Sequence, residues 1–173
     1  MSFEGNRIEE DPKIELRTGS KEEMFATASR LISKYSWGMD YPISPLHEIR
    51  QAEYSTGAYI ADTLVGFAGV SRHASPDGRD NGELWFGYAV VVPEWRGRGI
   101  FRMLYNTCMR YMEASSGRIL CCTDNPMVES FILKHGWRMI RKAQDESGAA
   151  CIVFEYDRVS RSSELQVGTY YQN

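Results

Sequence analysis

The sequence lacks a long apolar run. A membrane-spanning helix needs roughly 20 consecutive apolar residues, and charged residues interrupt every apolar stretch of this chain well before that length. No repeat or low-complexity segment is present either. With 173 residues, 43% of them hydrophobic, the chain is long enough for one domain with a substantial core. We therefore expect a soluble globular protein that has no membrane partner.

Cysteine is also scarce. The four cysteines, two of them adjacent at Cys121 and Cys122, do not show the spacing of a disulfide framework or of a metal site. Buried thiols in a reducing compartment are the expected state, and no metal is expected. The N-terminal residues are polar and acidic and lack the apolar core of a signal peptide. These observations predict a cytoplasmic location.

Charge is distributed unevenly along the chain. Residues 96–142 contain nine Lys and Arg against three Asp and Glu, whereas residues 1–95 contain nine against 15 and residues 143–173 two against five. Unless this clustering is accidental, the basic part favours an anionic ligand and the acidic parts favour a cation. A dense basic stripe with interleaved aromatic residues is missing, so no nucleic-acid partner is expected.

Hydrophobic periodicity predicts one α/β domain over residues 13–157, preceded by a flexible segment (1–12) and followed by a C-terminal tail (158–173). Ser20 is expected to cap the first helix, with Glu23 at the capping-box position. The predicted strands are 14–17, 57–61, 65–72, 83–92, 118–123, 137–143 and 149–156. The predicted helices are 20–33, 45–54, 100–117 and 127–135.

The most informative stretch is Val90–Phe101, in which an apolar strand leads through Gly97 and Gly99 into an amphipathic helix. Free N–H groups at a helix start and the helix dipole attract phosphate, although such a glycine pair also occurs in a simple tight turn. The dinucleotide fingerprint would need a third glycine at Arg102, and the nucleoside-triphosphate loop would need Gly-Lys-Ser/Thr, which is absent. A phosphate-bearing ligand of another kind is the first hypothesis.

Arg96-Gly97-Arg98-Gly99, after a strand ending in Val-x-Pro, resembles motif A of the GNAT N-acetyltransferase superfamily. Asn125 at the start of a later helix and Gly136-Trp137 before the next strand extend the resemblance over residues 57–157, whereas Phe101 departs from the Gly or Ala of the motif. The implied fold is α/β, with a mixed, mostly antiparallel sheet, a splayed central strand pair and flanking helices.

The resemblance implies acetyl-CoA as co-substrate and direct transfer of an acetyl group to a primary amine of a small molecule or peptide. The pantetheine arm would pair with the strand backbone at Ala89, Val91 and Val92. The pyrophosphate would rest on the glycine turn and helix start, comprising Arg96, Gly97, Arg98, Gly99, Ile100, Phe101 and Arg102. Asn125 would contact the coenzyme, serve as a helix N-cap, or do both.

For catalysis, the resemblance implies that Glu83 is a general base, because its distance before Arg96 equals that of the catalytic glutamate in the histone-acetyltransferase branch of the superfamily. The alternative is a solvated glutamate at a strand end. Many members of the superfamily donate a proton from a Tyr seven residues after the Asn, where this chain has Ile132. Tyr105, Tyr88, His135 and water stay open as substitutes.

The acceptor side is predicted from an aromatic loop and nearby acids, because aromatic rings with carboxylates suit an ammonium group. The candidates are Tyr35, Trp37, Asp40, Tyr41 and Glu48. An alternative set adds Asp77 and Asp80 to these residues. In the alternative interpretation the aromatic loop only packs. A non-catalytic acyl-CoA-binding module is the alternative function, and the acceptor, the acyl preference and a homodimer are left open.

Overall fold

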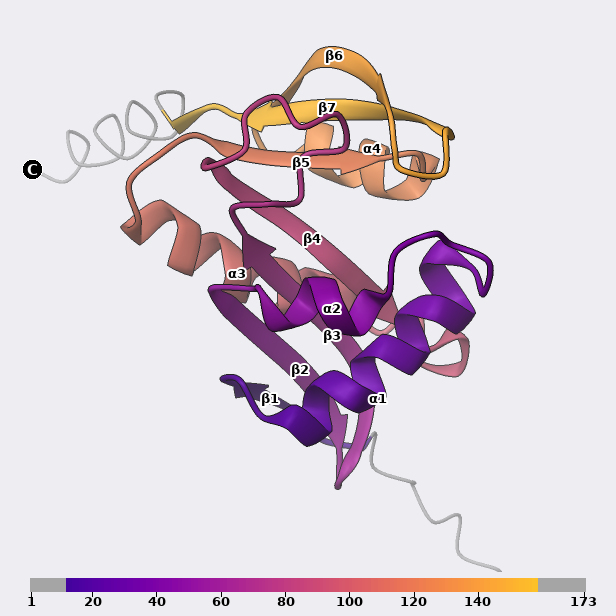
Figure 1. The fold of residues 1–173 in the computed structure, drawn as a ribbon. Coiled ribbons are helices and arrows are strands. Elements are labelled where there is room, and N and C mark those ends of the chain that lie inside the picture. The colour runs from indigo at the N-terminus through magenta and orange to yellow at the C-terminus, as the bar shows by residue number, and fades with distance from the viewer. Residues whose placement is uncertain (1–11, 159–173) are drawn as a thin grey trace, which may run out of the picture.

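The computed structural model describes residues 12–158 as one sheet flanked by helices (Figure 1). The seven strands are β1 (Ile14–Thr18), β2 (Tyr54–Ile60), β3 (Thr63–Ser71), β4 (Leu84–Val91), β5 (Ile119–Thr123), β6 (Trp137–Gln144) and β7 (Ala150–Tyr156). Their order in the sheet is β1-β2-β3-β4-β5-β7-β6, and β4 with β5 is the parallel pair. The predicted mixed, mostly antiparallel sheet is confirmed. The predicted segment 1–12 and tail 158–173 lie, except for residues 12 and 158, outside the described residues.

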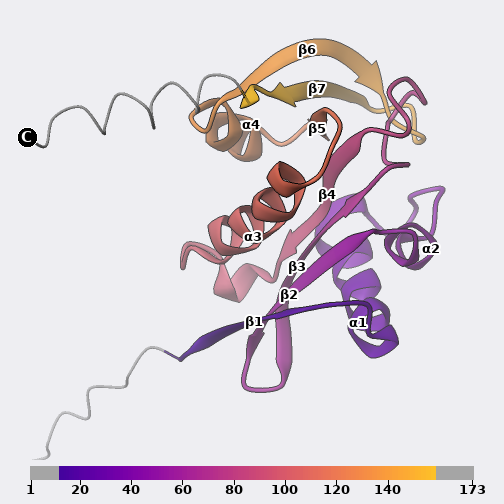
Figure 2. The ribbon, with the colours of Figure 1, turned by 90° about the vertical axis from the view of Figure 1, so that its left-hand side faces the viewer.

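The helices cover both faces of the sheet (Figure 2). One face is covered by α1 (Glu22–Ile32) and α2 (Pro45–Arg50), the other by α3 (Ile100–Ala114) and α4 (Pro126–Leu133). Each face has its own cluster of buried apolar side chains. Among the described residues, no helix is both long and apolar enough to cross a membrane.

Helix α3 forms because its apolar side chains recur every three or four residues. Ile100, Leu104, Cys108 and Met112 are at most 1% exposed and face β2, β3 and β4. The helix begins at Gly99, whose φ of +77° is a left-handed conformation that glycine adopts without a Cβ penalty. The predicted helix is therefore confirmed, although it ends at Ala114 instead of Gly117.

The structure corrects the predicted start of α1 and the end of α2. Lys21 is the N-cap of α1 and no side chain caps that end, so the proposed Ser20 capping box does not form. A single π-helical turn, η1 (Ser33–Trp37), follows α1 where a loop is predicted. Helix α2 ends at Arg50, and the chain then enters β2 from Tyr54 because strand pairing with β3 outweighs local helix propensity.

The central feature for function is the divergence of β4 from β5. These strands pair only at Leu84↔Ile119, Trp85↔Leu120 and Phe86↔Cys121, so the later part of β4 has no strand partner on its β5 side. A bulge lies at this point, because Phe67↔Val90 and Gly69↔Gly87 are successive pairs with one residue of β3 facing Tyr88 and Ala89 of β4. The predicted splayed central pair is confirmed.

Candidate functional site: an open strand edge beside a helix N-terminus

The open edge of β4 presents main-chain groups without a strand partner. The N–H of Val92 donates to Val65 in β3 at 2.9 Å, and because peptide groups alternate along a strand, those of Val91 point to the opposite, open side. Ala89 at the bulge lies on the same open stretch. An extended ligand with amide groups could therefore pair along this edge as a strand would.

Val92 does not belong to this edge, which corrects its predicted role in pairing with the pantetheine arm. Its N–H is used by Val65, and its carbonyl accepts from the N–H of Trp95 at 2.9 Å. That second bond closes the 3-10 turn η2 (Pro93–Trp95) between β4 and the glycine turn. Arg96 is likewise engaged within the chain, since its Nε donates to the carbonyl of Val91 at 3.0 Å.

The glycine turn that follows leaves several N–H groups between residues 97 and 102 without a backbone acceptor in the described part of the chain, and we call this group of N–H groups the cradle. Gly97 and Gly99 both have φ of +77°, and a Cβ at either position would meet nothing within 4 Å. The first bond of α3 runs from the N–H of Met103 to the carbonyl of Gly99. The preceding N–H groups have no backbone acceptor among the described residues, namely those of Gly97, Gly99, Ile100, Phe101 and Arg102. Unbonded N–H groups at the positive end of the dipole of a 15-residue helix are chemically suited to an anion.

Phe101, the departure from the resembled motif, does not obstruct this cradle. Its ring centroid lies 5.1 Å from that of Phe131 and 6.3 Å from that of Phe86, so the side chain packs into the core. The backbone N–H of residue 101 stays at the helix start.

Asn125 is the N-cap of α4. Its Oδ1 accepts from the N–H of Met127 at 2.9 Å, and its own N–H donates to Oγ1 of Thr123 at 3.0 Å. The capping role is confirmed. Because Thr123 is the last residue of β5, Asn125 also stands at the open end of the diverging pair.

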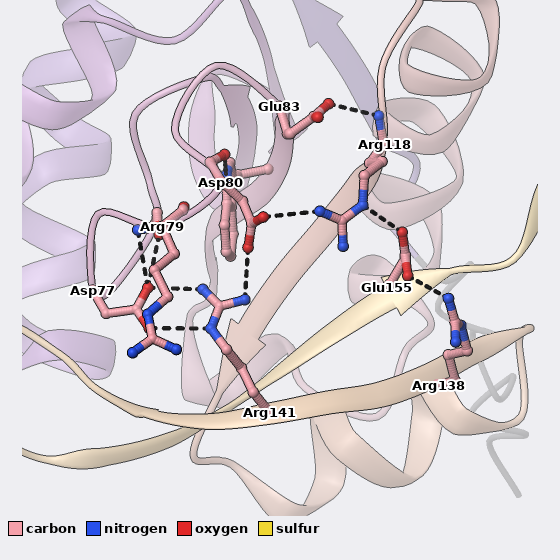
Figure 3. Close-up of polar contacts among 10 residues, drawn as sticks. Asp77, Arg79, Asp80, Glu83, Arg118, Arg138, Arg141 and Glu155 are labelled. Carbon is pink, nitrogen blue, oxygen red and sulfur yellow. Dashed lines mark hydrogen bonds and ion pairs between the residues drawn. The ribbon is translucent and has the colours of Figure 1, made fainter.

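Glu83 lies at the other, closed end of β4 (Figure 3). Its Oε2 accepts from the backbone N–H of Arg118 at 2.8 Å. All three β4–β5 residue pairs lie between Glu83 and the open part of the sheet. Glu83 thus helps to close the seam between the two strands, and its contacts argue against the predicted role of general base.

Asp77 and Asp80 belong to an ion-pair network at that same closed end (Figure 3). Arg141 of β6 donates to both oxygens of Asp77, at 2.7 and 3.1 Å, and to Asp80 at 2.7 Å. Arg118 then joins Asp80 to Glu155 at 2.8 and 2.6 Å. These contacts fasten the β3–β4 connection to β5, β6 and β7, which corrects the idea that the two aspartates meet an acceptor.

Replacing Asp77 by Asn should reveal this network through pH. The hydrogen bonds from Arg141 lower the pKa of Asp77 to about 2, so its stabilising effect is full above its ordinary pKa of 3.8 and is lost as pH falls toward about 2. We expect Asp77→Asn to lower the free energy of unfolding by about 1 kcal/mol at neutral pH. This is less than the full pKa shift would give, because the Asp77–Arg141 pair is partly exposed and water screens it. Urea denaturation between about pH 7 and about pH 3 should show the difference shrinking as the pH falls.

The control for this measurement is Asp62→Asn, because the side chain of Asp62 is 97% exposed in its pair with Arg17. That variant should show no such pH-dependent difference. Parallel pH curves for wild type and Asp77→Asn would contradict the assignment.

Aromatic side chains gather on the opposite side of the sheet from α3, on the face that α1 and α2 cover (Figure 2). The ring of Trp37 packs on Tyr41 and on Tyr88, with centroids 4.8 and 6.1 Å apart. Tyr88 is the bulge residue, with φ of +58°, and its hydroxyl donates to Oγ of Ser71 at 3.0 Å. A non-glycine residue in this conformation stores strain of about 1–3 kcal/mol, which is common at functional sites.

Two of the predicted acceptor residues, Trp37 and Tyr41, thus form one group with Tyr88. Tyr35 packs against the same apolar cluster, with Nζ of Lys34 over its ring at 4.9 Å. Asp40 is exposed and contacts none of these rings among the described residues. The aromatic loop therefore both packs and presents two rings toward the bulge.

Glu48 of α2 is the carboxylate that this arrangement singles out. Burial raises the pKa of Glu48, and the negative charge of Glu146 raises it further, while His47 and His73 oppose the shift. The charge of Glu48 also acts on Tyr88, whose pKa burial raises to about 12. A partly buried carboxylate with a raised pKa beside a strained strand is a candidate proton acceptor.

Comparison with known proteins identifies the family to which this fold belongs. A sequence model described as the acetyltransferase (GNAT) family matches residues 19–137. The chain belongs to the GNAT acetyltransferase family. No curated protein matches the sequence.

Among solved structures, the chain is similar to PH1933 from Pyrococcus horikoshii OT3, with a TM-score of 0.65 and 17% identity over 84% of this chain and 99% of that one. It is also similar to Arabidopsis thaliana Naa50 in complex with the bisubstrate analogue CoA-Ac-MVNAL (TM-score 0.63, 17% identity, 83% and 98% covered). An aminoglycoside 6′-N-acetyltransferase complexed with coenzyme A gives a TM-score of 0.61 and 16% identity over 82% and 95%. At these identities the likeness shows the GNAT fold.

The tyrosines and the histidine considered as proton donors in this GNAT chain each take part in a hydrogen bond within the chain. Ile132, where many relatives of the resembled motif carry Tyr, is fully buried and has no proton to give. The Tyr105 hydroxyl accepts from the indole N–H of Trp137 at 2.7 Å. Nδ1 of His135 lies 2.6 Å from the carbonyl oxygen of Phe131, and the two rings stack. Tyr88 is held by Ser71.

Two adjacent cysteines of this GNAT domain, Cys121 and Cys122, have suppressed thiolates, whereas the hydrogen bond with Cys122 lowers the pKa of Cys151. Burial raises the pKa of Cys121, and a hydrogen bond to Cys151 with burial raises the pKa of Cys122 well above its usual range. Because the thiolate is the reactive form, neither residue suits a covalent acyl intermediate. Among residues 12–158, no three His, Cys, Asp or Glu side chains gather as a metal site would require.

Proposed function

We propose that this GNAT chain is an acetyl-CoA-dependent N-acetyltransferase that transfers an acetyl group directly to a primary amine of a small molecule or peptide. The observation that carries the proposal is that an unpaired strand edge runs into a helix start with free N–H groups. The unpaired edge of β4 leads, through Gly97 and Gly99, into the free N–H groups at the start of α3. An extended amide chain that ends in a diphosphate fits both.

Coenzyme binding follows from these groups. The N–H groups from Gly97 to Arg102 hold the diphosphate, while the main chain of Ala89 and Val91 pairs with the amides of the pantetheine arm. Asn125, at the open end of β5, contacts the same arm as it caps α4. The basic residues 96–142 add a long-range attraction for the anionic coenzyme.

The bulge at Tyr88 then defines where the thioester lies. At the bulge Ala89 has no register partner in β3, and in this proposal its N–H donates to the thioester carbonyl oxygen and stabilises the negative charge that develops there. The amine binds beside the thioester, on the sheet face that α1 and α2 cover. There it contacts the rings of Trp37, Tyr41 and Tyr88.

Proton removal from the amine is assigned to Glu48. A lysine-like ammonium with a pKa of about 10.4 costs roughly 4.6 kcal/mol to neutralise at neutral pH, and an ordinary carboxylate accepts its proton poorly. The raised pKa of Glu48 reduces this mismatch. Glu48 takes the first proton from the ammonium, directly or through water. The neutral amine then attacks the thioester carbonyl carbon, the C–S bond breaks, and the second nitrogen proton leaves to water or to the departing thiolate.

The leaving thiolate requires little assistance, because thiols have a pKa near 8.5 and the negative charge is tolerated in water. This agrees with the engagement of Tyr105, Tyr88 and His135 in internal bonds. The absence of a proton donor at Ile132 is also the observation that favours the second candidate, an acyl-CoA-binding module without catalytic activity.

Thiol release from acetyl-CoA separates the two candidates. We expect turnover with at least one amine in a panel of polyamines, amino acids, aminoglycosides and peptides with free N-termini. The panel includes a peptide and an aminoglycoside because two similar structures are Naa50 with the peptide-bearing analogue CoA-Ac-MVNAL and an aminoglycoside 6′-N-acetyltransferase. Tight coenzyme binding without turnover on any amine would favour the binding module.

A further inference from the structure

One hydrogen bond joins two distant segments on the acceptor side. The hydroxyl of Tyr41, in the connection between η1 and α2, donates to Oε2 of Glu146 at 2.8 Å. Glu146 lies in the turn between β6 and β7, 105 residues along the chain. In Figure 1 the connection before α2 and the β6–β7 turn lie at the same end of the sheet.

The two ends of this contact differ in rigidity. Oδ1 of Asp145 accepts from the N–H of Ser147 and of Ala149 and from the Ser147 hydroxyl, so the turn that presents Glu146 is held by three bonds. On the other side, the segment bearing Tyr41 starts at Gly38, whose φ of +92° and open surroundings suit a hinge. Displacing Tyr41 from Glu146 would therefore require movement on the Gly38 side and none in the turn.

The contact also lies on a continuous path to the bulge. From Glu146 the path runs through the ring of Tyr41 to Trp37 at 4.8 Å, and from Trp37 to Tyr88 at 6.1 Å. The charge of Glu146 is felt at both Glu48 and Tyr88. An amine that approaches the thioester on this face passes these groups.

We infer that Tyr41 and Glu146 form a latch, and that the ammonium group of the acceptor opens it by replacing the Tyr41 hydroxyl on the Glu146 carboxylate. The inference rests on the proposed function and names Glu146 as an acceptor-binding residue. The bond from the Tyr41 phenol to the carboxylate is charge-assisted on one side only, whereas an ammonium adds a full positive charge that the carboxylate attracts, so a cationic amine competes with the phenol for Glu146. The freed ring of Tyr41 and that of Trp37 then contact the cation.

The latch sets specificity for the acceptor without touching the coenzyme. Removing the competing hydroxyl in Tyr41→Phe should strengthen amine binding about threefold. Removing the carboxylate charge in Glu146→Gln should weaken it about tenfold, as expected for an ammonium that loses a charged partner. In both variants the KM for acetyl-CoA should change less than twofold.

The experiment titrates spermidine, and separately a short peptide with a free N-terminus, into the full chain saturated with coenzyme A. Tryptophan fluorescence reports binding, because Trp37 stacks on Tyr41. The controls are Tyr59→Phe, which removes a hydroxyl beside Arg17, and Glu23→Gln, which removes an exposed carboxylate of α1. Both should bind the amines as the wild type does.

Three outcomes would overturn the latch. In the first, Glu146→Gln binds both amines as tightly as its control. In the second, Tyr41→Phe weakens binding as much as Glu146→Gln does, so that the phenol supports the amine instead of competing with it. In the third, neither amine binds to the wild type saturated with coenzyme. Failure of the proposed function is distinguishable, because the wild type would then give no heat when titrated calorimetrically with coenzyme A, or would bind coenzyme A and release no thiol from acetyl-CoA with any amine of the panel.

Discussion

Gly99→Val should lower the affinity for acetyl-CoA at least tenfold while the fold is retained. A valine side chain at this position would project into the space that the phosphate oxygens need, since the surroundings of Gly99 are open within 4 Å. It would also have to adopt a φ of +77°, at a cost of about 1–2 kcal/mol for a residue with a Cβ. Calorimetric titration with acetyl-CoA, together with thermal unfolding, measures both effects.

The matched control is Gly78→Val in the β3–β4 connection. Gly78 has φ of +72° and its nearest neighbour is Nδ2 of Asn81 at 4.0 Å, so a valine there meets the same backbone strain in similarly open space. We expect a comparable loss of stability and unchanged coenzyme affinity. Equal affinities for the two variants would contradict the assignment of the cradle.

Glu48→Gln should reduce kcat about a hundredfold, the usual contribution of a positioned general base. The base acts in its charged form, so the wild-type rate should rise with pH through the raised pKa of Glu48 and level off above it. The glutamine variant should lose this rise and keep its KM for acetyl-CoA. Steady-state thiol release across the pH range, with the best acceptor of the amine panel, makes the comparison.

Glu83→Gln is the comparison variant, because Glu83 was the base expected from its sequence position and lies instead at the closed seam. Its bond to the N–H of Arg118 predicts a loss of stability with an unchanged pH profile. A pH profile that flattens in Glu83→Gln and persists in Glu48→Gln would reverse the assignment.

The sequence was sufficient for the parts of the site that depend on local patterns. Gly97, Gly99 and the apolar spacing of α3 follow from backbone freedom and helical period, which are properties of neighbouring residues. The capping role of Asn125 is local in the same way, since its acceptor bond is to a residue two positions on. The order of helices and strands and the splayed pair agreed with the resemblance to the GNAT superfamily.

The parts that failed depend on contacts between distant segments. Whether Val92 is free depends on Val65, and whether Glu83 is free depends on Arg118, 35 residues away. The raised pKa of Glu48 comes from burial, which single-sequence spacing does not display. Tyr88 was considered from the sequence only as a proton donor, and its place in a bulge has no signal there, because the bulge is set by the register of β3 against β4.

The central claim is that coenzyme A lies along the open edge of β4 with its diphosphate on the start of α3. Amide-resolved NMR of the isotope-labelled chain, titrated with coenzyme A, tests it most directly. We expect the largest shifts at the N–H groups of Gly97, Gly99–Arg102, Ala89 and Val91, and little change at Val92, whose N–H is already bonded to Val65. Saturable binding that leaves Gly97 and Gly99 unshifted, or no binding, would contradict the account.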